Sequence, residues 1–141
     1  MQSKLENYKF LLKNEQCLGK GSFGYVTLVK NRIKNRKEAM KVINKNYVSK
    51  FEGGNLLERE VVIHKSLSHP NIIRLFDYFE DEKNLYLLME YAECGNLYKQ
   101  LKKVGKYSEK EVFNIFIQAT LGIDFLHKNK IIHRDLKPEN L

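Results

Sequence analysis

Several features of extracellular, membrane-spanning or multidomain proteins are missing from this 141-residue sequence. Its only two cysteines, Cys17 and Cys94, fit neither a CxxC motif nor a metal-ligand spacing, so no disulfide framework is implied. It has only two prolines and no low-complexity segment, so nothing marks a flexible linker. The N-terminal segment lacks a signal-peptide core, and no apolar run is long enough to span a membrane. These absences predict an intracellular protein, cytoplasmic or nuclear, without a membrane span.

The charge of the chain is unbalanced, because 25 Lys and Arg residues face 17 Asp and Glu residues and give a formal net charge of +8. Such an excess suits an anionic ligand, either a nucleotide phosphate or a nucleic acid. The basic residues are scattered, and the clusters at Arg32–Lys37 and Lys99–Lys106 are mixed with apolar residues. They lack the pattern of a nucleic-acid recognition motif, so we expect a solvated basic surface and no nucleic-acid binding.

The first two thirds of the chain read as strands around one helix. A helix of about 14 residues is expected where Leu56, Ile63 and Leu67 recur at helical spacing. Strands are expected where short apolar runs are bounded by turn residues, at Phe10–Leu18, Tyr25–Lys30, Glu38–Ile43, Ile72–Phe79 and Leu85–Met89.

The last third reads as helical. A short helix is expected over Asn96–Val104, and a longer one starts at Ser108, where Glu111 three residues later completes a capping box. An apolar stripe along the longer helix needs a larger covering surface than the remaining residues supply. Its members are Val112, Phe116, Ala119, Ile123 and Leu126.

A strand-rich part followed by a helical part predicts an α+β fold in two lobes. The expected small lobe is a five-stranded antiparallel sheet with one helix over residues 10–89, after a lead-in at residues 1–9. A hinge is expected at residues 90–95, and the start of a helical large lobe at residues 96–141.

A glycine-rich turn, Gly19-Lys20-Gly21-Ser22-Phe23-Gly24, lies between the first two expected strands. Missing Cβ atoms would let backbone N–H groups approach a phosphate closely, although a flexible hairpin turn explains the glycines equally well. A strand follows the glycines where a dinucleotide-binding turn would need a helix, so dinucleotide binding is disfavoured.

Lys41 lies among the apolar residues of an expected strand, where an ammonium group needs a counter-charge. The alternative is an edge strand from which Lys41 reaches water. Glu60 falls on the apolar stripe of the expected helix, so its carboxylate is expected to point inward and pair with Lys41. Glu58 lies about 200° around the helix from Glu60 and should face elsewhere.

The sequence His133-Arg134-Asp135-Leu136-Lys137-Pro138-Glu139-Asn140 follows the long helix. It places an acid, a base and an amide within six residues, although a polar surface loop is the simpler interpretation. In this order, the four motifs resemble the signature set of eukaryotic protein kinases. The resemblance runs from about Phe10 to Leu141 and implies a protein-kinase-like fold.

The resemblance also implies a role for each matching residue. Lys41 would hold the α- and β-phosphates of ATP, and Glu60 would orient Lys41. Asp135 would accept or orient the proton of the substrate hydroxyl, Lys137 would steady the transferring phosphoryl group, and Asn140 would bind Mg²⁺. The glycine loop, adenine slot, gatekeeper and hinge would be formed by Leu18, Gly19, Gly21, Gly24, Val26, Ala39, Met89, Glu90 and Ala92.

Lys137, two residues after Asp135, resembles the loop of serine/threonine kinases, which implies protein substrates that bear Ser or Thr. The segments Arg59–Val61, His69–Ile72 and Tyr86–Tyr91 look most like Aurora kinases, with polo-like and calmodulin-dependent kinases close behind.

The 141 residues contain no Asp-Phe-Gly, no activation loop and no Ala-Pro-Glu. We therefore expect a fragment of a longer kinase, or a truncated product, that is nearly inactive alone. A catalytically inactive nucleotide-binding or interaction module is the alternative, and the intact catalytic positions argue against it.

Overall fold

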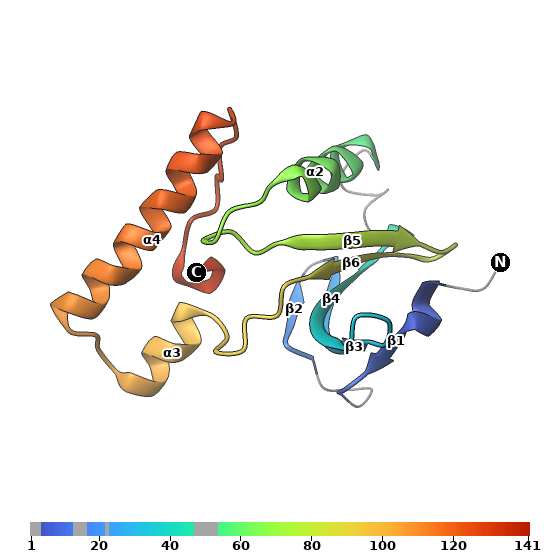
Figure 1. The fold of residues 1–141 in the computed structure, drawn as a ribbon, viewed down its shortest axis with the longest axis horizontal. Coiled ribbons are helices and arrows are strands. Elements are labelled where there is room, and N and C mark those ends of the chain that lie inside the picture. Colours follow the sequence, from blue (N-terminus) through green and yellow to red (C-terminus); the bar gives the residue numbers. More distant parts are fainter. Residues whose placement is uncertain (1–3, 13–16, 22, 47–53) are drawn as a thin grey trace. The chain divides into compact units, whose positions relative to one another are not determined.

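The computed structural model describes residues 4–12, 17–21, 23–46 and 54–141, with the side chains of residues 54–56 left out. The chain forms two compact units, one of residues 1–67 and 74–91 and one of residues 68–73 and 92–141. The first contains a sheet and the helix over Gly54–Ser66, and the second is helical (Figure 1).

The first unit is built on a six-stranded sheet with the order β1-β3-β4-β6-β5, in which β2 also pairs with β3. All its strand pairs are antiparallel. The strands are β1 (Tyr8–Phe10), β2 (Gly19–Gly21), β3 (Gly24–Asn31), β4 (Arg36–Asn44), β5 (Leu75–Glu80) and β6 (Asn84–Met89), preceded by the 3-10 helix η1 (Lys4–Asn7).

The predicted antiparallel α+β fold is confirmed, with one difference in the strand count. A single strand was expected over Phe10–Leu18, but β1 ends at Phe10 and β2 begins at Gly19. Residues 13–16 of the predicted strand lie outside the described residues. Both β1 and β2 pair with β3, so together they occupy the place of the single expected strand.

The sheet has an apolar core on each face. The helix α2 (Gly54–Ser66) packs on one face through Leu57 and Val61, where the buried residues are Ile43, Val61, Leu75, Leu85 and Leu87. On the other face, η1 and β1 contribute Leu5 and Tyr8 to a core of Val29, Met40, Val42, Tyr86 and Leu88. The period-2 alternation of β4 and β6 explains how two strands supply both cores.

The second unit contains α3 (Leu97–Val104), α4 (Glu109–Lys128) and the 3-10 helix η2 (Pro138–Asn140). The predicted capping box is present, because Ser108 and Glu111 form it at the start of α4, and the structure shows in addition that Asn96 caps α3. The predicted apolar stripe of α4 is uncovered toward its start, where Val112 and Phe116 are exposed, and covered toward its end, where Leu126 is buried.

The segment Ser68–Ile73 belongs with the helical unit, although a strand was expected to begin at Ile72. The rings of His69 and Phe125 stack with their centroids 4.9 Å apart. A Cβ at Gly122 would lie 3.1 Å from the carbonyl oxygen of Asn71, so a glycine there allows the close packing of the segment on α4.

One buried carboxylate organises the turn between β3 and β4. Glu38 is fully buried, and its Oε1 accepts hydrogen bonds from Asn31 Nδ2 at 3.0 Å and from Arg36 Nε at 2.8 Å. The Asn31 side chain in turn accepts hydrogen bonds from the backbone N–H groups of Ile33 and Lys34. Glu38 therefore ties the end of β3 to the start of β4.

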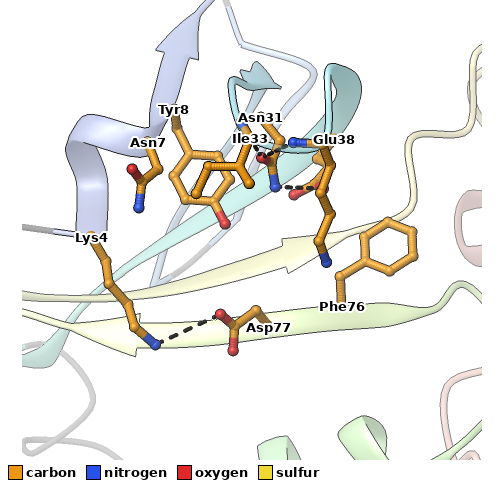
Figure 2. A pocket seen from close by; sticks show the side chains of 9 residues that line it. Lys4, Asn7, Tyr8, Asn31, Ile33, Glu38, Phe76 and Asp77 are labelled. Carbon is orange, nitrogen blue, oxygen red and sulfur yellow. Dashed lines mark hydrogen bonds and ion pairs between the residues drawn. The ribbon is translucent and has the colours of Figure 1, made fainter.

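Glu38 also lines a pocket of about 150 Å³, together with Tyr8, Phe76 and Asp77 (Figure 2). Burial, and then the Glu38 and Asp77 carboxylates, raise the pKa of Tyr8 to about 12, against the smaller opposing effect of Arg36. Glu38 and Ala39 are neighbours on β4, and neighbouring side chains of a strand point to opposite faces of the sheet. The pocket therefore lies on the face opposite the predicted nucleotide-binding residues.

Glu38→Ala should lower the free energy of unfolding of the chain by about 2 kcal/mol, because it removes the acceptor of a buried amide and breaks a partly buried ion pair. Urea unfolding of the two chains measures the difference. Glu82→Ala, at an exposed turn residue, should change stability by less than about 0.5 kcal/mol. Equal effects of the two substitutions would show that the Glu38 cluster adds nothing to stability.

Candidate nucleotide-binding face and catalytic loop

The strand register gathers the predicted nucleotide-binding residues on one face of the sheet. Val26 on β3 pairs with Lys41 on β4, which pairs with Leu87 on β6. Two residues along β4, Ala39 pairs with Met89. Directly paired residues, and residues two apart on a strand, point to the same side of a sheet. Val26, Ala39, Lys41 and Met89 therefore share one face, which is also the face that carries α2.

The glycine-rich turn is a β-hairpin between β2 and β3, with Gly21 paired to Gly24. The backbone N–H of Leu18 extends the pairing by donating to the carbonyl of Val26 at 2.8 Å. A strand follows the glycines directly, which excludes the strand–turn–helix arrangement of a dinucleotide-binding fold. Ser22, at the tip of the hairpin, lies outside the described residues.

The three glycines of this turn differ in whether the fold requires them. A Cβ at Gly24 would lie 1.8 Å from the carbonyl oxygen of Val42, so the packing of β3 on β4 excludes any side chain there. A Cβ at Gly19 or Gly21 would meet no described atom within 4 Å. Nothing in the described sheet therefore demands glycine at these two positions. The space that their missing side chains leave suits the close approach of a phosphate to the backbone.

Lys41 lies on β4, which has β3 on one side and β6 on the other. The edge-strand alternative is therefore wrong. The Lys41 side chain is exposed nevertheless, and no hydrogen bond or ion pair joins it to another of the described residues. Its ammonium group lies on the face that also carries Val26 and Ala39, with no carboxylate among the described residues paired to it.

Glu60 is exposed, so its predicted inward orientation is wrong for this structure. The side of α2 that packs on the sheet carries Leu57 and Val61, each one position after Leu56 and Glu60. This one-residue difference turns the helix by about 100° from the predicted orientation. Leu56, another member of the predicted stripe, has a side chain outside the described set, and Ile63 is exposed.

The first predicted hinge residue is held to the start of β5. The backbone N–H of Glu90 donates to the carbonyl of Arg74 at 2.9 Å, and Glu90 Oε2 accepts from the Arg74 N–H at 3.3 Å. Ala92, at the start of the helical unit, accepts from the N–H of Gly95 at 3.1 Å. The side chains of Glu90 and Ala92 are both exposed.

The predicted catalytic side chains of the helical unit lie together. Lys137 Nζ is 2.8 Å from Asp135 Oδ1, and Asn140 Nδ2 donates to Asp135 Oδ2 at 2.9 Å and to the Asp135 carbonyl at 2.8 Å. The loop that holds them is attached to α3 by a hydrogen bond from the N–H of Leu97 to the carbonyl of Leu141, at 2.7 Å.

These hydrogen bonds favour the ionised form of Asp135. The bond from Lys137, and then the bond from Asn140, lower the pKa of the Asp135 carboxyl below its ordinary value. The Asp135 carboxylate in turn raises the pKa of Lys137. Asp135 is therefore a carboxylate at neutral pH, able to accept a hydrogen bond from a hydroxyl group and orient it.

The amide of Asn140 fits the predicted magnesium role. Its nitrogen is used by Asp135, which leaves Oδ1 as the atom available to a ligand. Oxygen atoms of amides and carboxylates are the protein ligands that Mg²⁺ prefers.

One positioning residue was missed by the sequence reasoning. His133 Nδ1 accepts a hydrogen bond from the backbone N–H of Asp135 at 3.3 Å. Its place two residues before the acid was the available signal, because a side chain can bond its own backbone at that distance in sequence. Arg134, between them, adopts a left-handed backbone conformation with φ 64°.

Comparison with known proteins agrees with this arrangement. The family model described as the protein kinase domain matches residues 12–141. This chain belongs to the protein kinase family. The match includes the glycine-rich hairpin, Lys41 and the loop from His133 to Asn140. Residues of both units are therefore part of the matched kinase domain.

Among curated proteins, the chain is similar to Aurora kinases of several organisms. The chain is 40% identical to Aurora kinase B of Xenopus tropicalis and 41% identical to serine/threonine-protein kinase Aurora-1 of Arabidopsis thaliana, each over 124 residues and 88% of this chain. It is 42% identical to the Aurora kinase of Saccharomyces cerevisiae over 142 residues and 98% of this chain. These matches cover only 34%, 42% and 39% of the respective relatives, so the chain spans less than half of their length.

Among the described helices, none is long and apolar enough to cross a membrane.

Titration of Asp135 tests the hydrogen-bond network of this kinase loop. The ordinary pKa of an Asp carboxyl is 3.8, and the pKa of Asp135 is lowered from this value. The midpoint of its titration, measured by NMR, should therefore lie below pH 3.8. Lys137→Met should move the midpoint upward, because it removes the largest stabilising interaction. Lys128→Met removes a lysine that pairs with Asp124, and should leave the Asp135 midpoint unchanged. An Asp135 midpoint that does not respond to Lys137→Met would contradict the network.

Proposed function

We propose that this chain forms the ATP-binding sheet and catalytic loop of a protein serine/threonine kinase, which transfers the γ-phosphoryl group of ATP to Ser or Thr hydroxyls of proteins. The observation that carries the proposal is the Asp135 carboxylate, held between Lys137 and Asn140 in a loop with the kinase sequence pattern. Lys137 supports specificity for Ser and Thr rather than Tyr, in keeping with the Aurora kinases among the relatives.

The sheet unit would bind the nucleotide. Gly19 and Gly21 leave the backbone of β2 open to phosphate oxygens, and Gly24 keeps the hairpin close to β4. Leu18, Val26, Ala39 and Met89 would contact the adenine ring, and the backbone of Glu90 to Ala92 would bond to its edge. The exposed ammonium of Lys41 would neutralise the α- and β-phosphates.

The loop of the helical unit would carry the chemistry. Asp135 would orient the substrate hydroxyl and receive its proton as the oxygen attacks the γ-phosphorus and the bond from phosphorus to the ADP oxygen breaks. Lys137 would neutralise charge on the transferring group. Asn140 Oδ1 would ligate Mg²⁺, which supplies positive charge beside the phosphate oxygens.

The predicted pairing of Lys41 with Glu60 requires a different orientation of α2. In the present structure Glu60 is exposed, while the neighbouring Val61 faces the sheet. We infer that a turn of α2 about its axis would bring the Glu60 carboxylate toward Lys41. Bound phosphates would favour this turn if they fix the Lys41 ammonium near the helix.

A second function, a nucleotide-binding module without transferase activity, is supported by the exposed apolar residues of α4. Val112, Phe113 and Phe116 are 48%, 64% and 71% exposed. A stable kinase domain would need to cover such a surface. We therefore propose that the 141 residues alone bind ATP but transfer phosphate poorly, because positioning of the substrate makes the main contribution to phosphoryl transfer.

Nucleotide binding and phosphate transfer should be measured on the same preparation of the chain. Binding of ATP with Mg²⁺ is expected and should be weakened at least about tenfold by Lys41→Met, because the phosphates lose their cation. Transfer to a generic serine peptide should stay near the background given by Asp135→Asn. Lys45→Met removes another lysine of the sheet unit and should leave ATP binding nearly unchanged.

Two results would contradict these proposals. ATP binding that does not depend on Lys41 would remove the nucleotide-binding role of the sheet face. Rapid transfer that Asp135→Asn abolishes would keep the kinase function but show that these 141 residues suffice for it.

A further inference from the structure

A lysine-rich surface lies on the helix that is attached to the catalytic loop. The segment from Asn96 to Ser108 contains four lysines and no acidic residue. Its lysines are all exposed, and we call them the α3 lysine cluster: Lys99, Lys102, Lys103 and Lys106.

Helical spacing places these lysines close together. Lys99 is three residues before Lys102 and four before Lys103, and both spacings put side chains on neighbouring positions of a helix surface. Lys106 follows the helix end at Gly105, one four-residue step after Lys102. The opposite side of α3 carries Leu97 and Leu101, which are partly buried. Lys99, Lys102 and Lys103 thus form the outward face of an amphipathic helix, and Lys106 follows just after its end.

The like charges oppose one another, and the helix relieves this repulsion only in part. The helix dipole favours Lys102 and Lys103 in the last turn, but it disfavours a cation in the first turn, where Lys99 lies. Among the described residues, no carboxylate forms an ion pair with Lys102, Lys103 or Lys106. Ion pairs within the described fold therefore do not explain why Lys102, Lys103 and Lys106 are concentrated here, whereas an anionic partner would be favoured by them.

Tyr98 helps to keep one of these charges in place. The ammonium of Lys102 lies 4.7 Å from the centre of the Tyr98 ring, and interaction with the Tyr98 hydroxyl raises the pKa of Lys102. The Tyr98 ring is itself 39% exposed. A charged and an aromatic group are therefore both available on this surface.

The cluster is fixed to the predicted catalytic loop. The Leu97 N–H donates to the carbonyl of Leu141 at 2.7 Å, and Asn96 Oδ1 accepts from the backbone N–H of Lys99 at 2.9 Å. Gln100 Nε2 also donates to the carbonyl of Cys94 at 3.1 Å. The first of these bonds joins the start of α3 to the loop that carries Asp135, and the other two are local to the start of the helix, so the lysines lie on a helix attached to that loop.

We propose that the α3 lysine cluster binds acidic segments of protein substrates, and so favours Ser and Thr sites flanked by Asp or Glu. The proposal rests on the proposed kinase function for its biological meaning, but the binding itself needs no catalysis. A peptide chain advances about 3.3 Å per residue, so acidic residues a few positions from the target hydroxyl would come within the range of these charges.

Peptide binding to the 141-residue chain tests the proposal. Three fluorescent serine peptides of equal length, flanked by Glu, by Gln or by Lys, are titrated by anisotropy without ATP. The Glu peptide should bind at least about tenfold more tightly than the Gln peptide, and the difference should shrink as salt is raised. Changing the four cluster lysines to Gln together should abolish the preference.

Matched variants separate the cluster from net charge and from folding. Four exposed lysines of the sheet unit provide a control with the same change of charge when they are changed to Gln: Lys30, Lys34, Lys37 and Lys83. This control should keep the preference, as should a variant with Arg at the four cluster positions. Equal loss in the cluster and control variants, loss in the Arg variant, or absence of any preference in the parent chain would each overturn the proposal. Because ATP is absent, none of these results bears on the proposed phosphoryl transfer.

Discussion

The placement of β4 between β3 and β6 is the constraint on which the proposed nucleotide-binding face depends. Its register sets Lys41 opposite Val26 on one side and Leu87 on the other, and sets Ala39 opposite Met89. A slip of one residue would turn every side chain of β4 to the other face of the sheet. Lys41 would then leave the glycine-rich hairpin, and Met40 would leave the opposite core, where it is fully buried. The packing of both cores therefore fixes the position of the candidate phosphate-binding lysine.

The close approach of strands also explains the glycine pattern. Gly24 is required by the backbone of β4, whereas Gly19 and Gly21 are under no such demand within the described sheet. One sequence motif thus combines a structural glycine with two that leave room for a ligand. In the helical unit, Asp135 is held by neighbours only two and five residues away, so its geometry depends on a short loop rather than on distant packing.

The separation in sequence between interacting residues decides how much could be predicted from the sequence. The capping box of Ser108 and Glu111, the helix start at Asn96 and the clustering of Asp135, Lys137 and Asn140 are local, and the structure contains all of them. The antiparallel sheet was also predicted, because its apolar runs are short and bounded by turn residues.

The orientation of α2 was not predicted. Leu56, Ile63 and Leu67 form one apolar stripe, whereas Leu57 and Val61 form another about 100° around the helix, and sequence periodicity alone does not choose between them. The choice is made by contacts of Leu57 and Val61 with β-strand residues distant in the sequence. The division between β1 and β2 was missed because the sequence between them contains no Gly or Pro to mark an interruption.

The central claim is that the sheet face around Lys41 binds ATP and recruits Glu60 when it does so. The most direct test is a double-mutant cycle on the affinity for ATP with Mg²⁺, using Lys41→Met and Glu60→Gln in a folded form of the domain. The account predicts a coupling energy on the order of 1 kcal/mol or more between these two positions. The parallel cycle with Glu58→Gln, on another side of α2, should show none. Strict additivity of Lys41→Met and Glu60→Gln would contradict the claim that the two side chains pair around the bound nucleotide.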